Sequence, residues 1–429
     1  MDHGADPHGT NLAKQYLTMS APIIVGIDIG TTKVCTLVAR LEREHRMRIM
    51  GVGIEPSQGI RKGVVVDVNA AAKAISHSID KAERTSGLEI TSALVSLAGS
   101  HVASMNSRGV VGISQQVVDH EDVMRAMDAA RAIAIPHNRE VIHVIQRDFT
   151  VDGQDGIRMP IGMHGYRLEV EAHIITAAAS SVDNLRQCVA ASGVEVNQFV
   201  LNPLASGEVV LTETEREMGV VVCDIGGGTT DMAILIEGDV WHTGVLALGG
   251  NHVTSDIAHG LRMPFSQAEE IKLQHGHARA REVEGEEFFP VRVFGEDDPV
   301  QVSRTELTHI IEARVEEIFS LLLQEIKRSG YDGLLPAGMV LTGGTSQLPG
   351  IRQLVSDVLN LPVRLAQPEK IIGMVDKLHS PAYSTSVGLV KWATLMNEVL
   401  SGPTVQSGSV TSDSGDWGKV RDILRRFLP

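Results

Sequence analysis

One short motif occurs in both halves of this sequence and constrains its fold more than any other feature. Residues 23–33 read IIVGIDIGTTK, and residues 220–231 read VVVCDIGGGTTD. In both copies an apolar strand pattern leads to an aspartate, then to glycine and a pair of threonines, and a second apolar run follows. Each copy therefore predicts a β-hairpin with glycine at its tip. One copy alone would be an ordinary turn, whereas two copies predict a duplicated fold.

The two predicted hairpin tips have the chemistry of a phosphate site. Glycine lets the backbone adopt positive φ angles, so that several N–H groups can converge on one anion, and threonine hydroxyls add further donors. Two facing tips would hold a polyphosphate from opposite sides. The residues expected to do so are Asp28, Gly30, Thr31, Thr32 and Lys33 in the first copy and Gly226, Gly227, Gly228, Thr229 and Thr230 in the second.

Asp28 and Asp224 occupy equivalent places in the two copies. Because Mg²⁺ prefers oxygen ligands and keeps several of its waters, carboxylates a short distance away are enough to hold it. We therefore expect these two aspartates to hold a hydrated Mg²⁺ between the hairpins.

A third glycine-containing stretch, MVLTGGTSQLPG, occupies residues 339–350. It predicts a buried strand, a GG turn and a helix that begins near Ile351. Such a turn lets a base or an anion approach the backbone closely. Gly343, Gly344 and Thr345 are therefore expected to face a nucleoside.

In this order, the three stretches resemble the phosphate 1, phosphate 2 and adenosine motifs of the superfamily of actin, heat-shock chaperones and sugar kinases. The resemblance implies an actin-like α/β fold of two lobes, built on duplicated ribonuclease-H-like sheets, that binds ATP with Mg²⁺ in the cleft between the lobes. The stretch AEEIK at residues 268–272 is similar to one that contacts the nucleoside in actin-like ATPases. Glu269 and Lys272 would then contact ribose or adenine; the alternative is a surface ion pair at i,i+3 spacing.

Composition is that of a soluble globular protein. The chain has 429 residues, enough for two to four domains, and 43% of them are hydrophobic. The formal net charge of −15 argues against nucleic acid as a partner. Three cysteines are expected to be buried apolar residues in a reducing cytoplasm, and no apolar run approaches the roughly 18 residues that span a bilayer. Residues 1–20 are expected to form a disordered tail.

Residues 99–177 form an insertion that nucleotide binding does not require. The pattern predicts a helix over residues 121–133, a strand over 141–151, and a second strand over 168–177 that follows the turn-rich stretch PIGMHGYRLE. This stretch and the position of the insertion resemble subdomain 1C of the bacterial division family FtsA. His164 and Tyr166 lie beside glycines in a loop, where a structural role is favoured over a catalytic one.

The FtsA resemblance implies a division of the chain into four subdomains. Their expected ranges are 21–98, 178–205 and 361–400 for 1A, 99–177 for 1C, 206–247 and 335–360 for 2A, and 248–334 for 2B. Within 1A, Asn69 is expected to cap a helix, and helices are also expected over residues 180–192 and 203–211. Chaperone relatives have a glutamate where this chain has Asn202, which cannot act as a base. The expectation is therefore ATP binding with at most weak hydrolysis and no identified catalytic residue.

The segment before the third motif contains a charged loop and a long helix. Residues 279–299 are expected to form the loop. Residues 307–328 predict an amphipathic helix with an apolar face that comprises Leu307, Ile310, Ile311, Val315, Ile318, Leu322 and Ile326. Its charged side chains are first of all a solvated face. The FtsA resemblance also implies that Arg314 and Glu317 receive the C-terminal peptide of the tubulin-like division GTPase FtsZ.

The end of the chain predicts a tethered membrane helix. Residues 401–415 are rich in Gly, Ser, Thr and Pro and are expected to form a flexible linker with a reach of about 20 Å. Residues 416–429 combine an apolar face with basic residues, which is typical of a helix on an anionic membrane surface. The alternative is docking on a protein surface. The expected membrane residues are Trp417, Val420, Arg421, Ile423, Leu424, Arg425, Phe427 and Leu428.

FtsA proteins end in such a helix, so the resemblance covers residues 23–429. It implies an ATP-binding protein that anchors FtsZ filaments to the cytoplasmic face of the inner membrane at the septum, self-associates into actin-like filaments, and recruits later division proteins through subdomain 1C. Nucleotide would act as a switch more than as fuel. The alternatives are a pilus-assembly relative, which shares the inserted subdomain, and a sugar kinase, for which the insertion and the C-terminal helix have no use.

Overall fold

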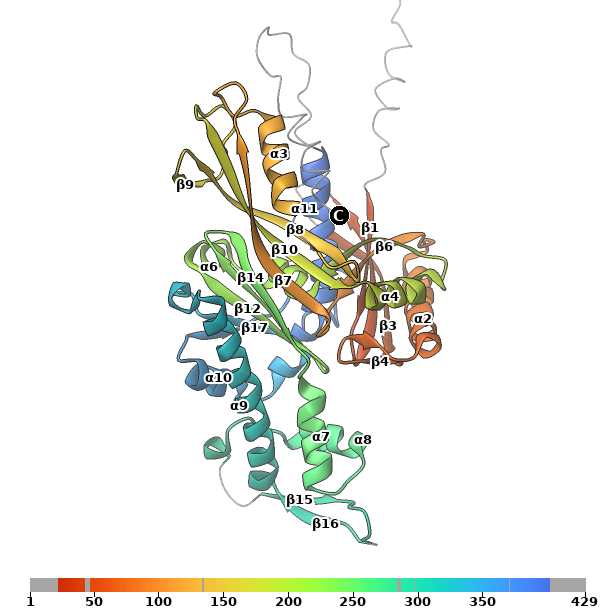
Figure 1. Cartoon of the computed structure of the whole chain (residues 1–429). Helices are drawn as coiled ribbons and strands as arrows, with labels where there is room; N and C mark the ends of the chain where they lie inside the picture. The colour runs from red at the N-terminus through yellow and green to blue at the C-terminus, as the bar shows by residue number, and fades with distance from the viewer. Residues whose placement is uncertain are drawn as a thin grey trace, which may run out of the picture.

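The protein is built on two large sheets, one in each lobe, with a third sheet beside them (Figure 1). Figure 1 shows the first sheet with α2 and α4 on the right, and helices α7 to α9 extending away from the second sheet to the hairpin of β15 and β16. The computed structural model describes residues 22–42, 47–132, 135–283, 287–296, 298–369 and 371–401.

The first sheet has the strand order β11-β6-β1-β2-β3-β19. Its strands are β1 (Ile23–Ile29), β2 (Lys33–Leu41), β3 (Met47–Pro56), β6 (Ser92–Leu97), β11 (Glu195–Leu201) and β19 (Ile372–Gly373), and a small hairpin joins β4 (Ile60–Arg61) to β5 (Val64–Val65). Helices α2 (Val68–Ser86) and α4 (Ala179–Ala190) pack beside it.

The cap of α2 is Asp67, whose carboxylate accepts from the N–H groups of Asn69 and Ala70. The prediction that Asn69 is the cap was therefore wrong. A carboxylate before the first turn satisfies two otherwise unpaired donors.

The second sheet has the order β14-β13-β12-β17-β18. Its strands are β12 (Val220–Ile225), β13 (Thr230–Ile236), β14 (Asp239–Leu246), β17 (Met339–Thr342) and β18 (Val363–Leu365). In each lobe the hairpin strand pairs antiparallel with the next strand and parallel with a strand much later in the chain, β1 with β2 and β6, and β12 with β13 and β17. The two sheets therefore repeat one topology, and the predicted duplication is confirmed.

The insertion forms its own four-stranded sheet with the order β7-β10-β8-β9. Its elements are β7 (Val102–Gly112), α3 (His120–Arg131), β8 (Arg139–Val151), β9 (Gln154–Ile157) and β10 (Arg167–Ala178). The expected helix and two strands are present, whereas β7 and β9 were not predicted. Helix α3 packs on one face of the sheet, where a Cβ atom on Gly109 would lie 1.9 Å from the carbonyl oxygen of Ala126.

The outer part of the second lobe is mainly helical. Its elements are α7 (Gly250–Gly260), α8 (Phe265–His275), η2 (Ala280–Glu282), β15 (Phe288–Val291), β16 (Val300–Ser303) and α9 (Arg304–Ser329). The prediction of a loop over residues 279–299 was wrong, because this segment contains η2 and β15, and β15 pairs with β16. Of the predicted apolar face of α9, all members are buried except Ile310, which packs partly buried against the same core, and Phe319 joins them.

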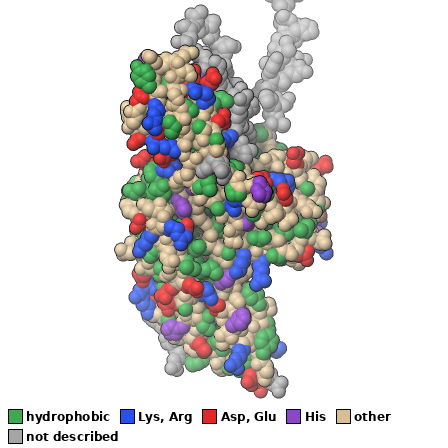
Figure 2. All heavy atoms as spheres, in the orientation of Figure 1, with side chains coloured by type: hydrophobic (Ala, Val, Ile, Leu, Met, Phe, Trp, Pro, Cys, Tyr) green, Lys and Arg blue, Asp and Glu red, His purple; other side chains and the backbone are tan. Residues whose placement is uncertain are grey.

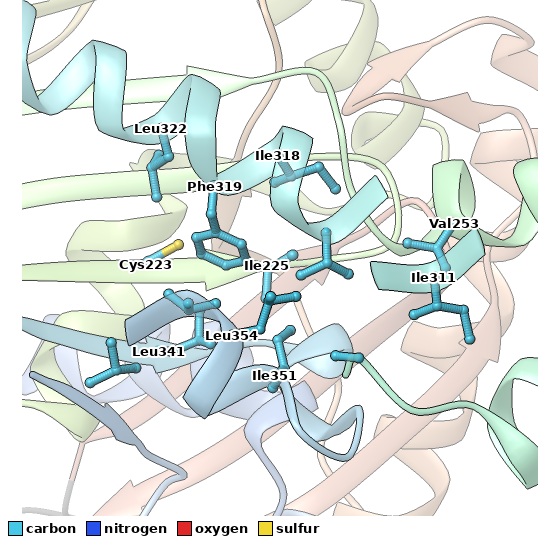
Figure 3. Packing of buried hydrophobic residues seen from close by; sticks show 14 of the residues in the cluster. Cys223, Ile225, Val253, Ile311, Ile318, Phe319, Leu322, Leu341, Ile351 and Leu354 are labelled. Atoms are coloured by element: carbon cyan, nitrogen blue, oxygen red, sulfur yellow. The ribbon is translucent and has the colours of Figure 1, made fainter. Parts of the chain in front are cut away.

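The core beneath the second hairpin connects α9 and α10 (Ile351–Leu359) to the central strands. Figure 3 shows Cys223 on β12 and Leu341 on β17 near Phe319 and Leu322 on α9 and Leu354 on α10. All three cysteines are buried and free, as predicted. Ile225, at the end of β12, belongs to the same cluster. The strand that carries the second hairpin is thus fixed by aliphatic packing on its inner face.

The remaining elements are two short helices, three 3-10 turns and one long helix. They are α5 (Asn202–Val210), α6 (Glu213–Met218), η3 (Asp332–Leu334), η4 (Gly344–Gln347), η5 (Pro381–Tyr383) and α11 (Ser384–Ser401).

Among the described residues no helix is both long enough and apolar enough to cross a bilayer. The expected N-terminal tail, and all but the first residue of the expected linker together with the membrane helix, lie outside the described residues. Figure 2 shows acidic and basic side chains interspersed over the visible face.

Helices α5 and α11 cross at a glycine. A Cβ atom on Gly388 of α11 would lie 2.0 Å from the carbonyl oxygen of Ala205 on α5, so the two backbones are in direct contact. On α5 itself, a Cβ atom on Gly207 would meet only side-chain carbons at 3.7 and 3.8 Å. The two glycines therefore differ in whether the structure has room for a methyl group.

We predict that Gly388→Ala destabilises the protein by about 1–3 kcal/mol, because α5 and α11 must move apart to admit the methyl group. Urea denaturation of the two variants measures this. Gly207→Ala is the matched control and should keep or slightly raise the stability, since alanine is the better helix former. Equal stability of the two variants would contradict the close crossing.

Candidate functional site

The tips of the two hairpins face each other across the junction of the lobes. A Cβ atom on Gly228 would lie 2.3 Å from Oγ1 of Thr31, and one on Gly227 would lie 2.4 Å from Cγ2 of Thr32. Any side chain at either glycine would push the tips apart. The structure thus brings together the two copies of the motif, and it explains why the second tip consists of glycines.

The threonine hydroxyls of the second hairpin donate to groups within the protein. Thr229 donates to Oδ2 of Asp231 at 2.7 Å, and Thr230 donates to the carbonyl oxygen of Leu248 at 2.9 Å. Both hydroxyl protons are thus engaged within the protein, and a role for Thr229 and Thr230 as phosphate donors stays a prediction. Within the described residues the N–H groups of Gly227 and Gly228 form no hydrogen bond, so they are free to donate to a ligand at this tip.

The third motif packs directly onto the second. Gly343 has a φ of +89°, and a Cβ atom there would lie 2.4 Å from Oδ1 of Asp224. The hydroxyl of Thr345 donates to the carbonyl oxygen of Gly226 at 2.9 Å. Glycine is therefore required at position 343 both by its backbone angle and by the neighbouring carboxylate.

Helix α7 begins against the same hairpin. The N–H groups of Gly250 and Asn251 donate to the carbonyl oxygens of Gly226 and Gly227 at 2.9 and 2.8 Å. Sequence reasoning did not assign these two residues to the site. The signal was present, because a glycine pair that opens a helix after a strand is a common anion-binding arrangement.

A cavity of about 360 Å³ lies between these elements. Of the predicted nucleotide residues it is lined by Thr32, Gly227, Glu269, Lys272, Gly344 and Thr345. Gly250, Asn251, Val253, Leu273, Gln347, Leu348 and Pro349 complete the lining. It therefore combines backbone and polar groups on the side of the hairpins with apolar side chains from α8 and the segment after β17.

Glu269 and Lys272 form an ion pair in which the side chain of Lys272 is mostly buried and that of Glu269 is 35% exposed. Lys272 is only 9% exposed, and its Nζ donates to Oε2 of Glu269 at 2.7 Å, to Oγ1 of Thr254 at 2.8 Å and to the carbonyl oxygen of Gly250 at 3.2 Å. The ammonium thus has three acceptors in the protein and fixes α8 to the start of α7. Both side chains also line the cavity, so the ion pair is compatible with contact to a ligand there.

Asp28 and Asp224 are buried beside the tips, with 6% and 8% exposure. Burial raises the pKa of Asp224 to about 6; the charge of Asp28 also raises it, whereas a hydrogen bond from Thr385 and the charge of Lys33 lower it. Asp231, on the strand opposite Asp224, is 1% exposed, and burial raises its pKa well above the usual value. Asp28 and Asp224 thus present carboxylate oxygens whose charges repel each other. A hydrated Mg²⁺ suits such a site, because it prefers oxygen ligands and its charge would offset this repulsion.

Lys33 is held on the other side of the first hairpin. Its Nζ donates to the carbonyl oxygen of Ala382 and lies 4.8 Å from the centroid of the Tyr383 ring. Both partners belong to η5, which leads directly into α11. The ammonium remains near the buried carboxylates, since its charge lowers the pKa of Asp224.

Arg314 and Glu317 lie on α9. Nη2 of Arg314 donates to Oδ1 of Asp256 on α7 at 3.0 Å, and Nη1 pairs with Glu317. The side chains of Arg314 and Glu317 are 24% and 53% exposed. These residues therefore form a connected, accessible cluster on α7 and α9. The expected membrane residues lie outside the described part of the chain.

Comparison with known families gives consistent matches. The family model described as "Cell division protein FtsA" matches residues 221–388, and the model described as "SHS2 domain inserted in FTSA" matches residues 99–176. The cell division protein FtsA of Pseudomonas aeruginosa is 42% identical over 95% of this chain and 98% of its own length. That of Borreliella burgdorferi is 44% identical over 87% of this chain and 91% of its own.

Solved structures share the fold at low identity. A structure described as the PilM-PilN type IV pilus biogenesis complex has a TM-score of 0.62 at 17% identity, over 87% of this chain and 98% of that one. MreB5 of Spiroplasma citri bound to ADP has a TM-score of 0.55 at 15% identity, over 89% and 99%. These likenesses confirm the predicted actin-like fold.

We predict that Asp224→Asn stabilises the nucleotide-free protein at about pH 8 by up to roughly 2–3 kcal/mol and has little effect at about pH 4. The folded-state pKa of Asp224 is raised, so its contribution to stability is present when it is protonated and is lost as the pH rises through about 6. Asparagine stays neutral and still accepts from Thr385.

Urea denaturation at the two pH values measures the effect. Asp80→Asn, at an exposed position on α2, is the control and should leave the difference between the two pH values unchanged. The interpretation fails if Asp224→Asn destabilises the protein at the higher pH.

Proposed function

The chain belongs to the FtsA family of cell division proteins, and from this we propose that it binds ATP with Mg²⁺ between its lobes and links FtsZ filaments to the inner face of the cytoplasmic membrane. Identity of 42% over 98% of a division protein favours this function over pilus assembly or sugar phosphorylation. The observation that carries the nucleotide proposal is the cavity flanked by two facing hairpin tips.

The phosphates would be held by backbone N–H groups of the second tip, above all Gly227 and Gly228, with Thr31, Thr32 and Lys33 opposite. Mg²⁺ would supply charge neutralisation between the phosphates and the two buried aspartates, and Asp28 and Asp224 would hold it through its waters. The nucleoside would occupy the part of the cavity lined by Gly344, Thr345 and the apolar residues from α8 and the segment after β17.

Slow hydrolysis is part of the proposal. Asn202 begins α5, and its Oδ1 is buried with no hydrogen-bond partner among the described residues. A carboxamide does not accept a proton at neutral pH, so Asn202 cannot activate a water as a glutamate would. Bound nucleotide would then persist and would act through the difference in affinity between conformations of the protein.

The FtsZ peptide would bind on α7 and α9 at the cluster of Asp256, Arg314 and Glu317. Arg314 is the residue best suited to recognise a peptide carboxylate, because its guanidinium forms paired hydrogen bonds with carboxylates. In the free protein it makes these bonds with Asp256. Binding would therefore exchange internal ion pairs for intermolecular ones.

The remaining parts of the proposal concern larger assemblies. Residues 416–429 would lie on the anionic membrane surface, and residues 401–415 would serve as the linker.

The chain would also self-associate into filaments. Apolar side chains exposed around β15 and β16 support this, since Phe288 and Phe294 are 52% and 68% exposed. Later division proteins would bind subdomain 1C, residues 99–177.

We predict that Gly227→Asp weakens ATP binding at least about tenfold, because a carboxylate at this tip repels the phosphates and its Cβ displaces Thr32. Titration with a fluorescent ATP analogue measures the affinity. Gly227→Ala separates the steric part from the charge, and Gly333→Asp, at a position with open space around it, is the control for added charge. An unchanged affinity in Gly227→Asp would rule out the proposed phosphate site.

We predict that the full chain sediments with vesicles that contain anionic lipid and carries purified FtsZ with it, whereas a chain that ends at Leu400 remains in the supernatant with FtsZ. Arg314→Glu should still sediment but retain at least about tenfold less FtsZ, because its own charge would repel the peptide carboxylate.

Arg328→Glu is the matched control, since Arg328 lies on the same helix and pairs with Glu325 at i,i+3 spacing as Arg314 does with Glu317. It should retain FtsZ. Sedimentation of the truncated chain would remove the membrane proposal, and full retention of FtsZ by Arg314→Glu would remove the peptide site.

A further inference from the structure

The first turn of α11 carries three consecutive hydroxyl residues, and each contacts a different motif strand. Ser384 shares a hydrogen bond of 2.6 Å with Thr342 at the end of β17. Thr385 donates to Oδ2 of Asp224 at 2.6 Å, and Ser386 donates to Oδ2 of Asp28 at 2.7 Å. One helical turn therefore joins the ends of all three strands that form the nucleotide motifs.

These contacts differ from ordinary helix capping. A capping hydroxyl accepts from a backbone N–H of its own first turn, as Ser380 does for η5. Here Thr385 and Ser386 donate instead, because a carboxylate can only accept. Ser384 and Ser386 are 0% exposed and Thr385 is 5% exposed, so water cannot replace any of the three bonds.

The two donated bonds fix the carboxylates in a particular orientation. Each engages Oδ2, and within the described residues Oδ1 of Asp28 and of Asp224 accepts no hydrogen bond. The two carboxylates are close enough for the charge of Asp28 to act on Asp224. Without the hydroxyls, repulsion between the carboxylates would favour rotation of the side chains away from each other.

We propose that Thr385 and Ser386 are positioning residues for the divalent cation that accompanies the nucleotide: each holds one oxygen of its aspartate so that the other faces the cation and its waters. This inference rests on the proposed function, since it concerns the same cleft. Hydrogen bonds to metal-binding carboxylates commonly set metal affinity in this way. Ser384 makes the same kind of bond in the same turn but touches no carboxylate, so it is not assigned this role.

The test compares the affinity for ATP in the presence of Mg²⁺ with the affinity in the presence of EDTA, using the full chain. The ratio of the two dissociation constants measures the contribution of the cation. We expect Ser386→Ala and Thr385→Ala to reduce this ratio about tenfold or more, with little change of affinity in EDTA. Thr385→Ser keeps the hydroxyl and should restore the ratio.

Ser384→Ala is the matched control, because it makes the identical change two residues away from Ser386. It should leave the ratio unchanged, even if it lowers the melting temperature as much as Ser386→Ala does. The inference is overturned if Thr385→Ala and Ser386→Ala keep the ratio of the unmodified protein, or if Ser384→Ala reduces it equally. Failure of the unmodified chain to bind ATP would overturn the proposed function and this inference together, and is distinguishable from both results.

Discussion

The structure depends on two carboxylates that are buried at equivalent places in the two lobes. Asp28 and Asp224 lie near the ends of β1 and β12, and burial makes the ionised form of Asp224 costly, as its raised pKa indicates. The fold offsets part of this cost with charge-assisted hydrogen bonds from Thr385 and Ser386 and with the nearby ammonium of Lys33. Much of the conformation around the cleft follows from keeping two like charges close together, and the same arrangement favours a cation between them.

Close backbone contact is what brings the equivalent parts of the duplicated sheets together. Helix α11 contacts α5 through Gly388, so the N-terminal turn of α11 can reach strand ends in both lobes. At the hairpin tips, the backbone of Gly227 and Gly228 lies directly against the side chains of Thr32 and Thr31. Helix α7 then begins on the carbonyl oxygens of the second tip. Glycine at these positions thus lets two elements approach closely, and a phosphate would use the same absence of side chains at the tips.

Sequence reasoning succeeded where the pattern is local. Each hairpin is a run of neighbouring residues with a characteristic order, so strands, tips and duplication could all be predicted. The hydroxyls of Thr385 and Ser386 could not be found in this way, because their partners lie 161 and 358 residues away in the sequence. The hydrogen bonds of the Thr229 and Thr230 hydroxyls could not be predicted for a related reason: the fold, and not the local pattern, places buried acceptors beside them. The segment 279–299 was predicted as a loop because its charges mask a strand of four residues.

The inserted sheet is more than an addition to the first lobe, because it covers an edge of the second. Strand β14 is the edge strand of the second sheet, and an exposed edge invites association with other chains. Here Ser104 of β7 donates to the carbonyl oxygen of Thr243 on β14 at 2.9 Å. The hydroxyl of Thr243 forms a hydrogen bond of 3.0 Å with Nε2 of the buried His173. Burial lowers the pKa of His173 to about 3, so the ring is neutral and can accept this bond. Strand β14 then leads to Leu248, whose carbonyl oxygen binds Thr230 of the hairpin. Strand β14 therefore connects the inserted sheet, through these hydrogen bonds, to the hairpin that forms half of the proposed phosphate site.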